Sequence, residues 1–263
     1  MLLTRRGGRL RALGYHGTPR VARDSFARQL DYLAKAYEPL DGPGLDRFFM
    51  DGVDAGVAGG KTALVVSFDD GLLSNYEVAA PMLEERGMRG FFFVTTGLPD
   101  AGGSAAFCDA HEINLPAGEE RGMVWDELRD LKARGHVIGC HTASHFRMRD
   151  PLEPGRIAAE ISGAKRGLEA ELGAPVRHFA WVGGEPDTYA AGAMKAVREC
   201  GFEYAFTTQS GLLRRGGDSL MIHRSILDAD MPYMAFRAKL AGLSDLMHAG
   251  RRHGVEARLG GLS

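Results

Sequence analysis

The chain has 263 residues, of which 44% are hydrophobic and 25% charged, and its formal net charge at pH 7 is −2. This composition is that of an ordinary globular protein, and a nearly neutral chain has no overall field that would favour nucleic acid or an anionic membrane. The three cysteines, Cys108, Cys140 and Cys200, are widely spaced, which argues against a disulfide framework and is typical of a reducing compartment.

The N-terminal sequence, MLLTRRGGRLRALGYHG, contains arginines but no apolar core followed by a small-residue cleavage site, so it does not resemble a signal peptide. No stretch approaches the roughly 18 consecutive apolar residues that a membrane-spanning helix needs. We therefore expect a cytoplasmic protein without a membrane span.

One pattern recurs along the chain: a helix-like stretch, a glycine and then a short apolar strand. The copies lie at residues 80–94, 128–140, 168–182 and 196–208, and residues 26–40 form a looser copy that lacks the glycine. A glycine just past a helix supplies its left-handed cap, and apolar strands that alternate with helices form a parallel sheet. We count about six to seven such units, which predict an α/β fold with a closed or nearly closed barrel. An open, doubly wound sheet is the alternative.

No linker rich in proline or serine divides the chain, so we predict one domain over residues 1–263. Its core covers about residues 11–240, and residues 241–263 form a C-terminal helix and tail. Residues 51–61, DGVDAGVAGGK, are interpreted as a flexible connector. Residues 98–122 are too long for a routine loop and are expected to cover a pocket.

A phosphate-loop pattern, AGVAGGKT, occupies residues 55–62. Such a loop must follow a strand and begin a helix, so that backbone N–H groups face the phosphates. Here Lys61 and Thr62 lead into a strand instead. The sequence therefore does not support a nucleotide site.

Two adjacent carboxylates end the apolar strand in ALVVSFDDGLLSN, residues 63–75. Catalytic groups gather at the C-terminal ends of parallel strands, and successive strand residues point in opposite directions. One of Asp69 and Asp70 could therefore hold a metal ion while its neighbour takes a proton from water. The alternative is structural: Asp70 caps a helix from Leu72 to about Arg86, and Asp69 faces solvent.

Two histidines follow another apolar strand in HVIGCHTASHF. His141 and His145 are four residues apart, which places both imidazoles on one face of a helical turn and suits two nitrogen ligands. With Asp70 they form a His-His-Asp set, and three protein ligands plus water is the open arrangement of a catalytic metal. Otherwise Thr142 or Ser144 simply caps the next segment.

Residues 67–71, SFDDG, and 141–145, HTASH, resemble the first two motifs of the polysaccharide deacetylases, the NodB-like carbohydrate esterases. LGYHG, QLDYLAKAYEPL and GFEYAFTTQSGLLRR are similar to a bacterial branch linked to exopolysaccharide metabolism. The resemblance runs from about residue 11 to 230. It implies a distorted (β/α) barrel of about seven parallel strands, and hydrolytic removal of acetyl groups from N-acetylated sugars.

Carried over by position, the resemblance implies that Asp69 is the general base and that Asp70, His141 and His145 bind a divalent metal. Zn²⁺ is the first choice, with Co²⁺, Ni²⁺ or Mn²⁺ as alternatives. The metal would keep Asp70 ionised, polarise the acetyl carbonyl and stabilise the oxyanion. The expected partner is an N-acetylated sugar or glycan, and not nucleic acid.

The third motif departs from the family pattern. In the similar branch it is roughly A-W/Y-P-Y/F-G, whereas here it is AWVGG, residues 180–184. Val182 replaces proline and Gly183 replaces the aromatic residue, which predicts a thinner wall for the sugar pocket. The Gly183 N–H could still bind the oxyanion, and Trp181 is either a stacking platform or a buried packing residue.

The general acid does not match a family motif closely. His223, in LMIHRSI at the end of a late strand, is our candidate, and His178 is the second choice. His16, in GYHG, follows the first strand and either lines the pocket or is structural.

The leading hypothesis is a metal-dependent hydrolase that acts on the amide C–N bond of N-acetylated sugars. One alternative is a hydrolase of another non-peptide C–N bond, such as that of a cyclic ureide. A second, suggested by the altered third motif, is a degenerate homologue that binds glycan without turning it over.

Overall fold

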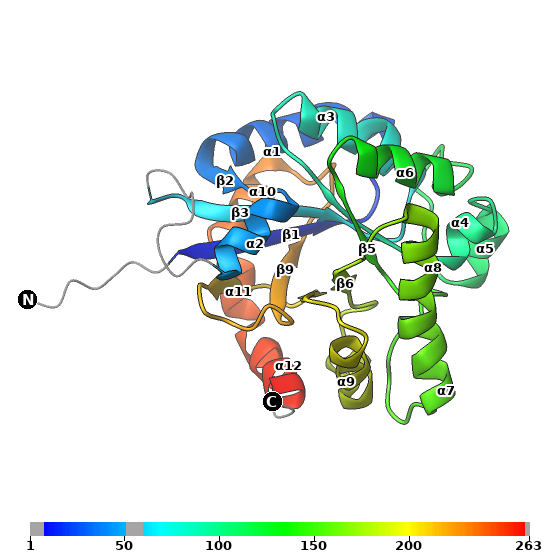
Figure 1. Ribbon diagram of the computed structural model, residues 1–263. Helices are drawn as coiled ribbons and strands as arrows, with labels where there is room; N and C mark the ends of the chain where they lie inside the picture. Colours follow the sequence, from blue (N-terminus) through cyan, green and yellow to red (C-terminus); the bar gives the residue numbers. More distant parts are fainter. Residues whose placement is uncertain (1–7, 51–59, 261–263) are drawn as a thin grey trace, which may run out of the picture.

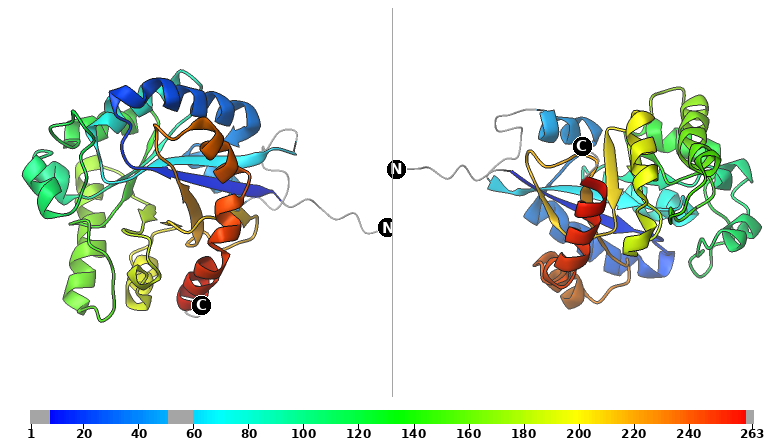
Figure 2. Two further views of the ribbon diagram at one scale, coloured as in Figure 1. Left: turned by 180° about the vertical axis from the view of Figure 1, so that it is seen from behind. Right: turned by 90° about the horizontal axis from the view of Figure 1, so that it is seen from below.

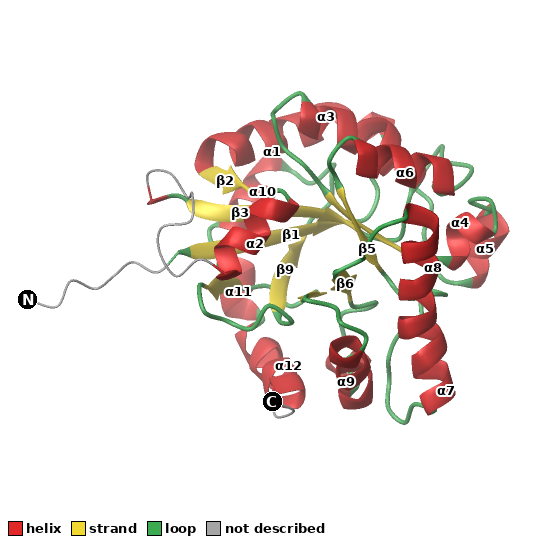
Figure 3. Ribbon diagram, in the orientation of Figure 1, coloured by secondary structure: helices red, strands yellow, loops and turns green. Residues whose placement is uncertain are grey.

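The computed structural model describes residues 8–50 and 60–260, so the connector expected over residues 51–61 lies almost wholly outside the described residues. Figure 1 shows strands enclosed by helices, and Figure 3 separates the two kinds of element by colour. None of the helices in these two described ranges is long and apolar enough to cross a membrane.

Seven parallel strands close into a barrel, which confirms the predicted architecture and excludes the open sheet. They are β1 (Arg9–Tyr15), β3 (Thr62–Phe68), β4 (Phe91–Val94), β5 (Val137–Cys140), β6 (His178–Ala180), β7 (Tyr204–Thr207) and β9 (Ile222–Ile226). The ring closes because β1 pairs on one edge with β3, Leu13 facing Val66, and on the other with β9, Leu13 facing Ser225.

Two short strands extend the sheet at the N-terminal ends of the barrel strands. β2 (Tyr37–Pro39) pairs in parallel with the start of β3, and β8 (Leu212–Arg214) pairs antiparallel with the start of β1. They share those edges with β4 and β9, which pair farther along the same strands.

Helices surround the barrel. They are α1 (Arg23–Ala36), α2 (Gly42–Met50), α3 (Ala80–Glu84), α4 (Gly97–Asp100), α5 (Ala105–Ala110), α6 (Trp125–Ala133), α7 (Pro154–Ile157), α8 (Ala164–Leu172), α9 (Ala191–Glu199), α10 (Tyr233–Leu240), α11 (Leu243–Met247) and α12 (Ala249–Gly260). Short 3₁₀ turns lie at η1 (Arg20–Ala22) and η5 (Pro186–Thr188), and π-helical turns at η3 (Asn75–Ala79) and η4 (Ala158–Gly163).

The strands separate two apolar cores, because alternate residues of a strand point to opposite faces. On β4, Phe91 and Phe93 belong to the cluster inside the barrel, whereas Phe92 and Val94 belong to the larger cluster beneath the helices. Helix α2 adds Phe48 to the inner cluster. The barrel is therefore a packed core, which leaves its loops to form the functional site.

The C-terminal residues fold back onto this barrel. In Figure 2 the last helices, orange to red, run along its side. Asp245 of α11 accepts two hydrogen bonds from Arg11 of β1, each 2.8 Å long. In the segment 241–263, for which a C-terminal helix and tail were predicted, the described residues form α11 and then α12, which continues to Gly260.

Candidate metal centre and its cavity

A cavity of about 480 Å³ opens at the C-terminal ends of the barrel strands. The residues that line it are His16, Asp69, Asp70, Glu112, Asn114, His141, His145, Arg147, Trp181, Gly183, Gly184, Glu185, Pro186, Thr208, Ile226 and Arg251. They include every residue predicted for the site except the two candidates for the general acid, His223 and His178. The long segment 98–122 contributes Glu112 and Asn114, so it does form part of the pocket wall.

Asp70, His141 and His145 converge in this cavity. Their ligand atoms lie within 4.8 Å of one another. The Nε2 atoms of His141 and His145 are 3.5 and 3.3 Å from Oδ1 of Asp70. Asp70 therefore does not simply cap the following helix, which was the structural alternative.

The other ring nitrogen of each histidine determines its tautomer. Nδ1 of His141 is 2.9 Å from the carbonyl oxygen of Ala180, and Nδ1 of His145 is 2.7 Å from that of His111. A carbonyl can only accept a hydrogen bond, so each Nδ1 carries the proton and each Nε2 keeps a lone pair for a ligand.

These lone pairs point towards a carboxylate oxygen that lacks a donor. Oδ1 of Asp70 is buried and accepts no hydrogen bond from the described residues. Two imidazole nitrogens and one carboxylate oxygen around an unsatisfied atom form the donor set of a three-ligand metal site. The residues present therefore fit a divalent metal.

The pKa shifts agree with a site for positive charge. Burial opposes ionisation of Asp70, but the two imidazoles outweigh it and hold the pKa of this carboxyl well below its ordinary value. Burial likewise lowers the pKa of His145, but Asp70 outweighs it and the net shift is upward. A proton or a metal ion can supply the charge that the cluster stabilises.

The backbone around the site is strained. Among the described residues, the non-glycines with positive φ are Asp70 (73°), Glu112 (56°), Thr142 (67°) and His145 (55°), and three of these line the cavity. Left-handed backbone costs about 1–3 kcal/mol at a non-glycine residue and persists where the surroundings enforce it. Two of the three candidate ligands are held in this way.

Asp69 is held differently from its neighbour. It is 2% exposed, and its Oδ1 is 2.6 Å from Nη1 of Arg224, a β9 residue with no exposed surface. The guanidinium also donates to Ser67 Oγ and to the Thr207 carbonyl. Arg224 was missed in the sequence; its signal was a cation inside the apolar strand LMIHRSI.

His223 does not reach the cavity. Neighbouring strand residues face opposite sides, so with Arg224 directed into the barrel, His223 faces outwards. Its Nδ1 is 2.9 Å from Thr207 Oγ1, and its Nε2 is 2.9 Å from Glu256 on α12. His178, the second choice, begins β6 and stacks on Tyr204, away from the lining residues.

The third motif is a tightly bonded loop. Trp181 is fully buried and packs against Phe179 and Tyr189, with ring centroids 5.4 Å apart in both pairs, which favours the packing interpretation. Gly183 has φ of 85°, and a Cβ there would lie 3.1 Å from Glu185 and from Thr188. An aromatic residue at 183 would be strained in this backbone.

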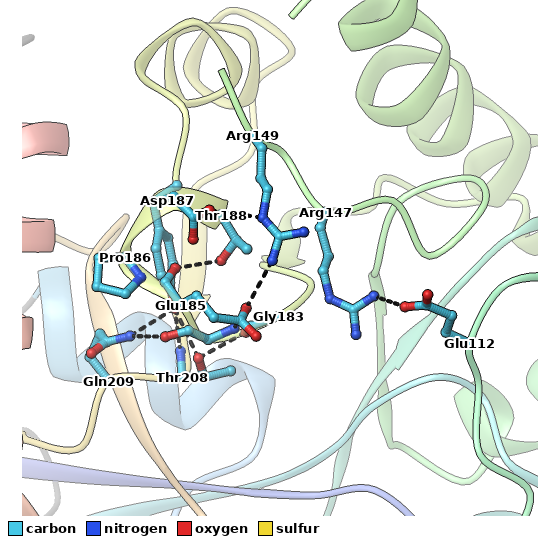
Figure 4. Close-up of polar contacts among 12 residues, drawn as sticks. Glu112, Arg147, Arg149, Gly183, Glu185, Pro186, Asp187, Thr188, Thr208 and Gln209 are labelled. Carbon is cyan, nitrogen blue, oxygen red and sulfur yellow. Dashed lines mark hydrogen bonds and ion pairs between the residues drawn. The ribbon is translucent and has the colours of Figure 1, made fainter. Parts of the chain in front are cut away.

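Figure 4 shows how this loop is held at the rim of the cavity. The carbonyl of Gly183 accepts a hydrogen bond from Thr208 Oγ1 (2.9 Å), and that of Gly184 accepts one from Gln209 Nε2 (2.8 Å). Arg149 reaches across from the loop after β5, with Nε 3.0 Å from Asp187 Oδ2.

A second ion pair lies beside this loop in the same view. Arg147 pairs with Glu112, and both side chains line the cavity. Charged and polar groups therefore line the cavity beside the loop in which the family pattern has an aromatic residue.

The sequence profile of the polysaccharide deacetylase family matches residues 56–205, more than half of the chain. The chain belongs to this family. A curated relative, the putative polysaccharide deacetylase YxkH of Bacillus subtilis (strain 168), is 21% identical over 183 residues. The aligned region covers 70% of this chain and 58% of YxkH, so the chain spans less than two thirds of that relative.

Solved structures of this deacetylase type share the fold. The Streptococcus pyogenes deacetylase PplD, in complex with acetate, superposes with a TM-score of 0.70 at 19% identity, over 89% of this chain and 98% of that chain. IcaB from Ammonifex degensii superposes with a TM-score of 0.67 at 24% identity, over 90% and 97%.

Proposed function

We propose that this polysaccharide deacetylase family member is a metal-dependent hydrolase that removes acetyl groups from N-acetylated sugars by breaking the amide C–N bond. One observation carries the proposal. Asp70, His141 and His145 converge with free ligand atoms in the cavity that also contains a second buried carboxylate, Asp69.

Asp70, His141 and His145 would hold the metal. Two nitrogen donors and one carboxylate suit Zn²⁺ first, with Co²⁺, Ni²⁺ or Mn²⁺ as alternatives. When bound, the metal would polarise the acetyl carbonyl and acidify the attacking water. The carbonyls of Ala180 and His111 keep both imidazoles in the orientation that this requires.

Asp69 accepts the proton of the attacking water in this proposal. Its Oδ1 is occupied by Arg224, and no described residue donates to its other oxygen. The buried guanidinium stabilises the carboxylate in its ionised form and fixes its orientation, which a general base needs.

The Gly183 N–H is proposed to bind the oxyanion, since it makes no hydrogen bond to another described residue. For the leaving amine, the cavity offers one ionisable group that is neither a candidate ligand, an arginine nor an ion-paired carboxylate. This group is His16, whose side chain is exposed. We therefore assign proton donation to His16 in place of His223.

The test is acetate release from N-acetylglucosamine oligomers by protein stripped with a chelator and then reloaded with Zn²⁺ or Co²⁺. We expect no release from the stripped protein and recovery on reloading. Turnover of a cyclic ureide instead would reassign the substrate. Glycan binding without acetate release from a metal-loaded protein would identify a binding homologue and refute the proposal.

The donor is tested by pH profiles of His16→Ala and His223→Ala. His16→Ala is expected to lose the alkaline limb of the profile, because that limb reports the essential acid. His223→Ala serves as the control, since its ring contacts Thr207 and Glu256 outside the cavity. The opposite result would restore His223 as the donor.

A further inference from the structure

The ligand loop, residues 142–144 between the candidate ligands His141 and His145, is hydrogen-bonded on two sides. On one side, the carbonyls of Thr142 and Ala143 accept hydrogen bonds from the N–H groups of Thr96 (3.1 Å) and Gly97 (2.8 Å). A Cβ on Gly97 would lie 2.9 Å from the Ala143 oxygen, so this approach requires glycine.

On the other side, the carboxylate of Glu160 accepts hydrogen bonds from the ligand loop. Oε2 of Glu160 accepts the N–H groups of Ala143 (3.0 Å) and Ser144 (2.9 Å). Oε1 accepts the hydroxyl of Ser144 at 2.7 Å and pairs with Arg156 at 3.0 Å. Hydrogen bonds from two backbone N–H groups and a hydroxyl to one charged carboxylate are strong and directional, so they fix the conformation of the ligand loop.

The burial of the Glu160 carboxylate is unfavourable by itself. Glu160 is 2% exposed and lies in the π-helical turn η4, nineteen residues after His141 in sequence and outside the cavity lining. Burial of a carboxylate is unfavourable unless hydrogen bonds and a counter-charge compensate it. The groups that compensate it lie on the ligand loop and on Arg156.

Glu160 bonds the ligand loop between two residues whose backbone conformation is unfavourable. Thr142 and His145 both have left-handed backbone, at φ 67° and 55°, so the segment does not adopt this shape by intrinsic preference. Without an acceptor for the Ala143 and Ser144 N–H groups, the loop would relax and the two Nε2 atoms would no longer converge on Asp70.

We propose that Glu160 is a positioning residue for the metal centre, which sets the geometry of His141 and His145 through the backbone of the loop between them. This inference rests on the metal site in the proposed function. Loss of an outer partner that orients metal ligands costs about 10- to 100-fold in metal affinity.

The experiment compares dissociation constants for Co²⁺ and Zn²⁺, measured by competition with a chromophoric chelator, in wild type, three Glu160 variants and one control variant. Glu160→Ala is expected to bind 10- to 100-fold more weakly than wild type, by the scale above. Glu160→Gln keeps an oxygen for both N–H groups and is expected to lose less than about tenfold. Glu160→Asp cannot reach all three donors and is expected to fall between them.

Glu169→Ala is the matched control. Glu169 lies on α8, which continues the same helix. Its Oε1 accepts hydrogen bonds from the Val176 N–H (3.0 Å) and from Lys165 Nζ (2.8 Å), away from the ligand loop. It should bind metal as wild type does. Amide hydrogen exchange in metal-free protein should accelerate at Ala143 and Ser144 in Glu160→Ala, and not in the control.

Equal metal affinity in folded Glu160→Ala and wild type would overturn the proposal. If Glu160→Ala does not fold, Glu160→Asp and Glu160→Gln decide: wild-type affinity in both would also overturn it. A wild-type protein that binds neither metal would refute the proposed function itself, which is a different result from equal affinities.

Discussion

Each end of the barrel contains an aspartate, an arginine and a histidine, but the two sets are built differently. At the C-terminal end, the side chains of Asp69 and Arg224 are 2% and 0% exposed. At the N-terminal end, those of Asp46 and Arg177 are 26% and 29% exposed, and their ion pair faces solvent in part.

The histidines differ in the same way. His141 and His145 donate Nδ1–H to carbonyls and direct Nε2 at Asp70. His178 lies between aromatic rings, and its Nε2 has no hydrogen-bond partner among the described residues. The comparison teaches that convergence of free ligand atoms on a buried carboxylate, and not residue type, defines the candidate site.

The largest expected effect concerns the two arginines. Arg224→Met leaves Asp69 buried without its partner and should lower the free energy of unfolding by about 3–5 kcal/mol. Arg177→Met removes a partly exposed ion pair and should cost about 1 kcal/mol or less. Urea unfolding measures both, and Asp69→Asn combined with Arg224→Met should recover part of the loss. Equal costs at the two ends would contradict the comparison.

The next largest effect is the difference in metal affinity between variants of His141 and His178. His141→Ala removes a ligand and should weaken Zn²⁺ binding by more than the roughly 100-fold that an outer-shell change costs. His178→Phe should leave it unchanged. Elemental analysis of the purified proteins checks this, and full metal occupancy in His141→Ala would remove that residue from the site.

The third comparison is the rate of acetate release in variants of Asp69 and Asp46. Asp69→Asn preserves size but removes the base, so acetate release should fall about 100-fold or more while metal content stays constant. Asp46→Asn, whose carboxylate accepts from Arg177 and Tyr204 at the opposite end, is the control and should keep the rate. Loss of metal in Asp69→Asn would mean that the two neighbouring carboxylates do not have separate roles.

The smallest effect is the acid sensitivity that His178 confers. Burial lowers the pKa of His178 from 6.5 to about 3. The unfolded chain therefore binds this proton more readily, and the stability contribution is complete above pH 6.5 and is lost as pH falls towards 3. At pH 5 the loss should reach about 2 kcal/mol. His178→Phe should show a shallower decline in urea unfolding between pH 7 and 4.5, and an unchanged decline would assign the sensitivity to other groups.

Much of the fold and the convergence of the three candidate metal ligands could be predicted, because strand periodicity and the two short motifs are local in sequence. On β9, however, periodicity shows only that His223 and Arg224 face opposite sides. Burying an arginine is unfavourable without its partner, and that partner, Asp69, is 155 residues away. The prediction therefore favoured the histidine.

Backbone partners were also invisible in the sequence. His111 supplies a carbonyl to His145, and any residue type could do so. Glu160 accepts backbone N–H groups, which have no side-chain signature. The Gly183 conformation had a signal in the glycine itself, but the sequence alone does not distinguish a missing aromatic residue from a required left-handed turn.

The closure of the barrel by β1 has a consequence for synthesis of the chain. β1 lies between β3, which follows it, and β9, which is translated about 160 residues later than β3. A nascent chain therefore holds one edge of its first strand open until residue 226 has left the ribosome, and long-range pairing of this kind is slow to form. Until then Asp69 also lacks Arg224. Strand β9 must be complete before the Asp69 carboxylate acquires its counter-charge, so a chain truncated before β9 would be prone to aggregate.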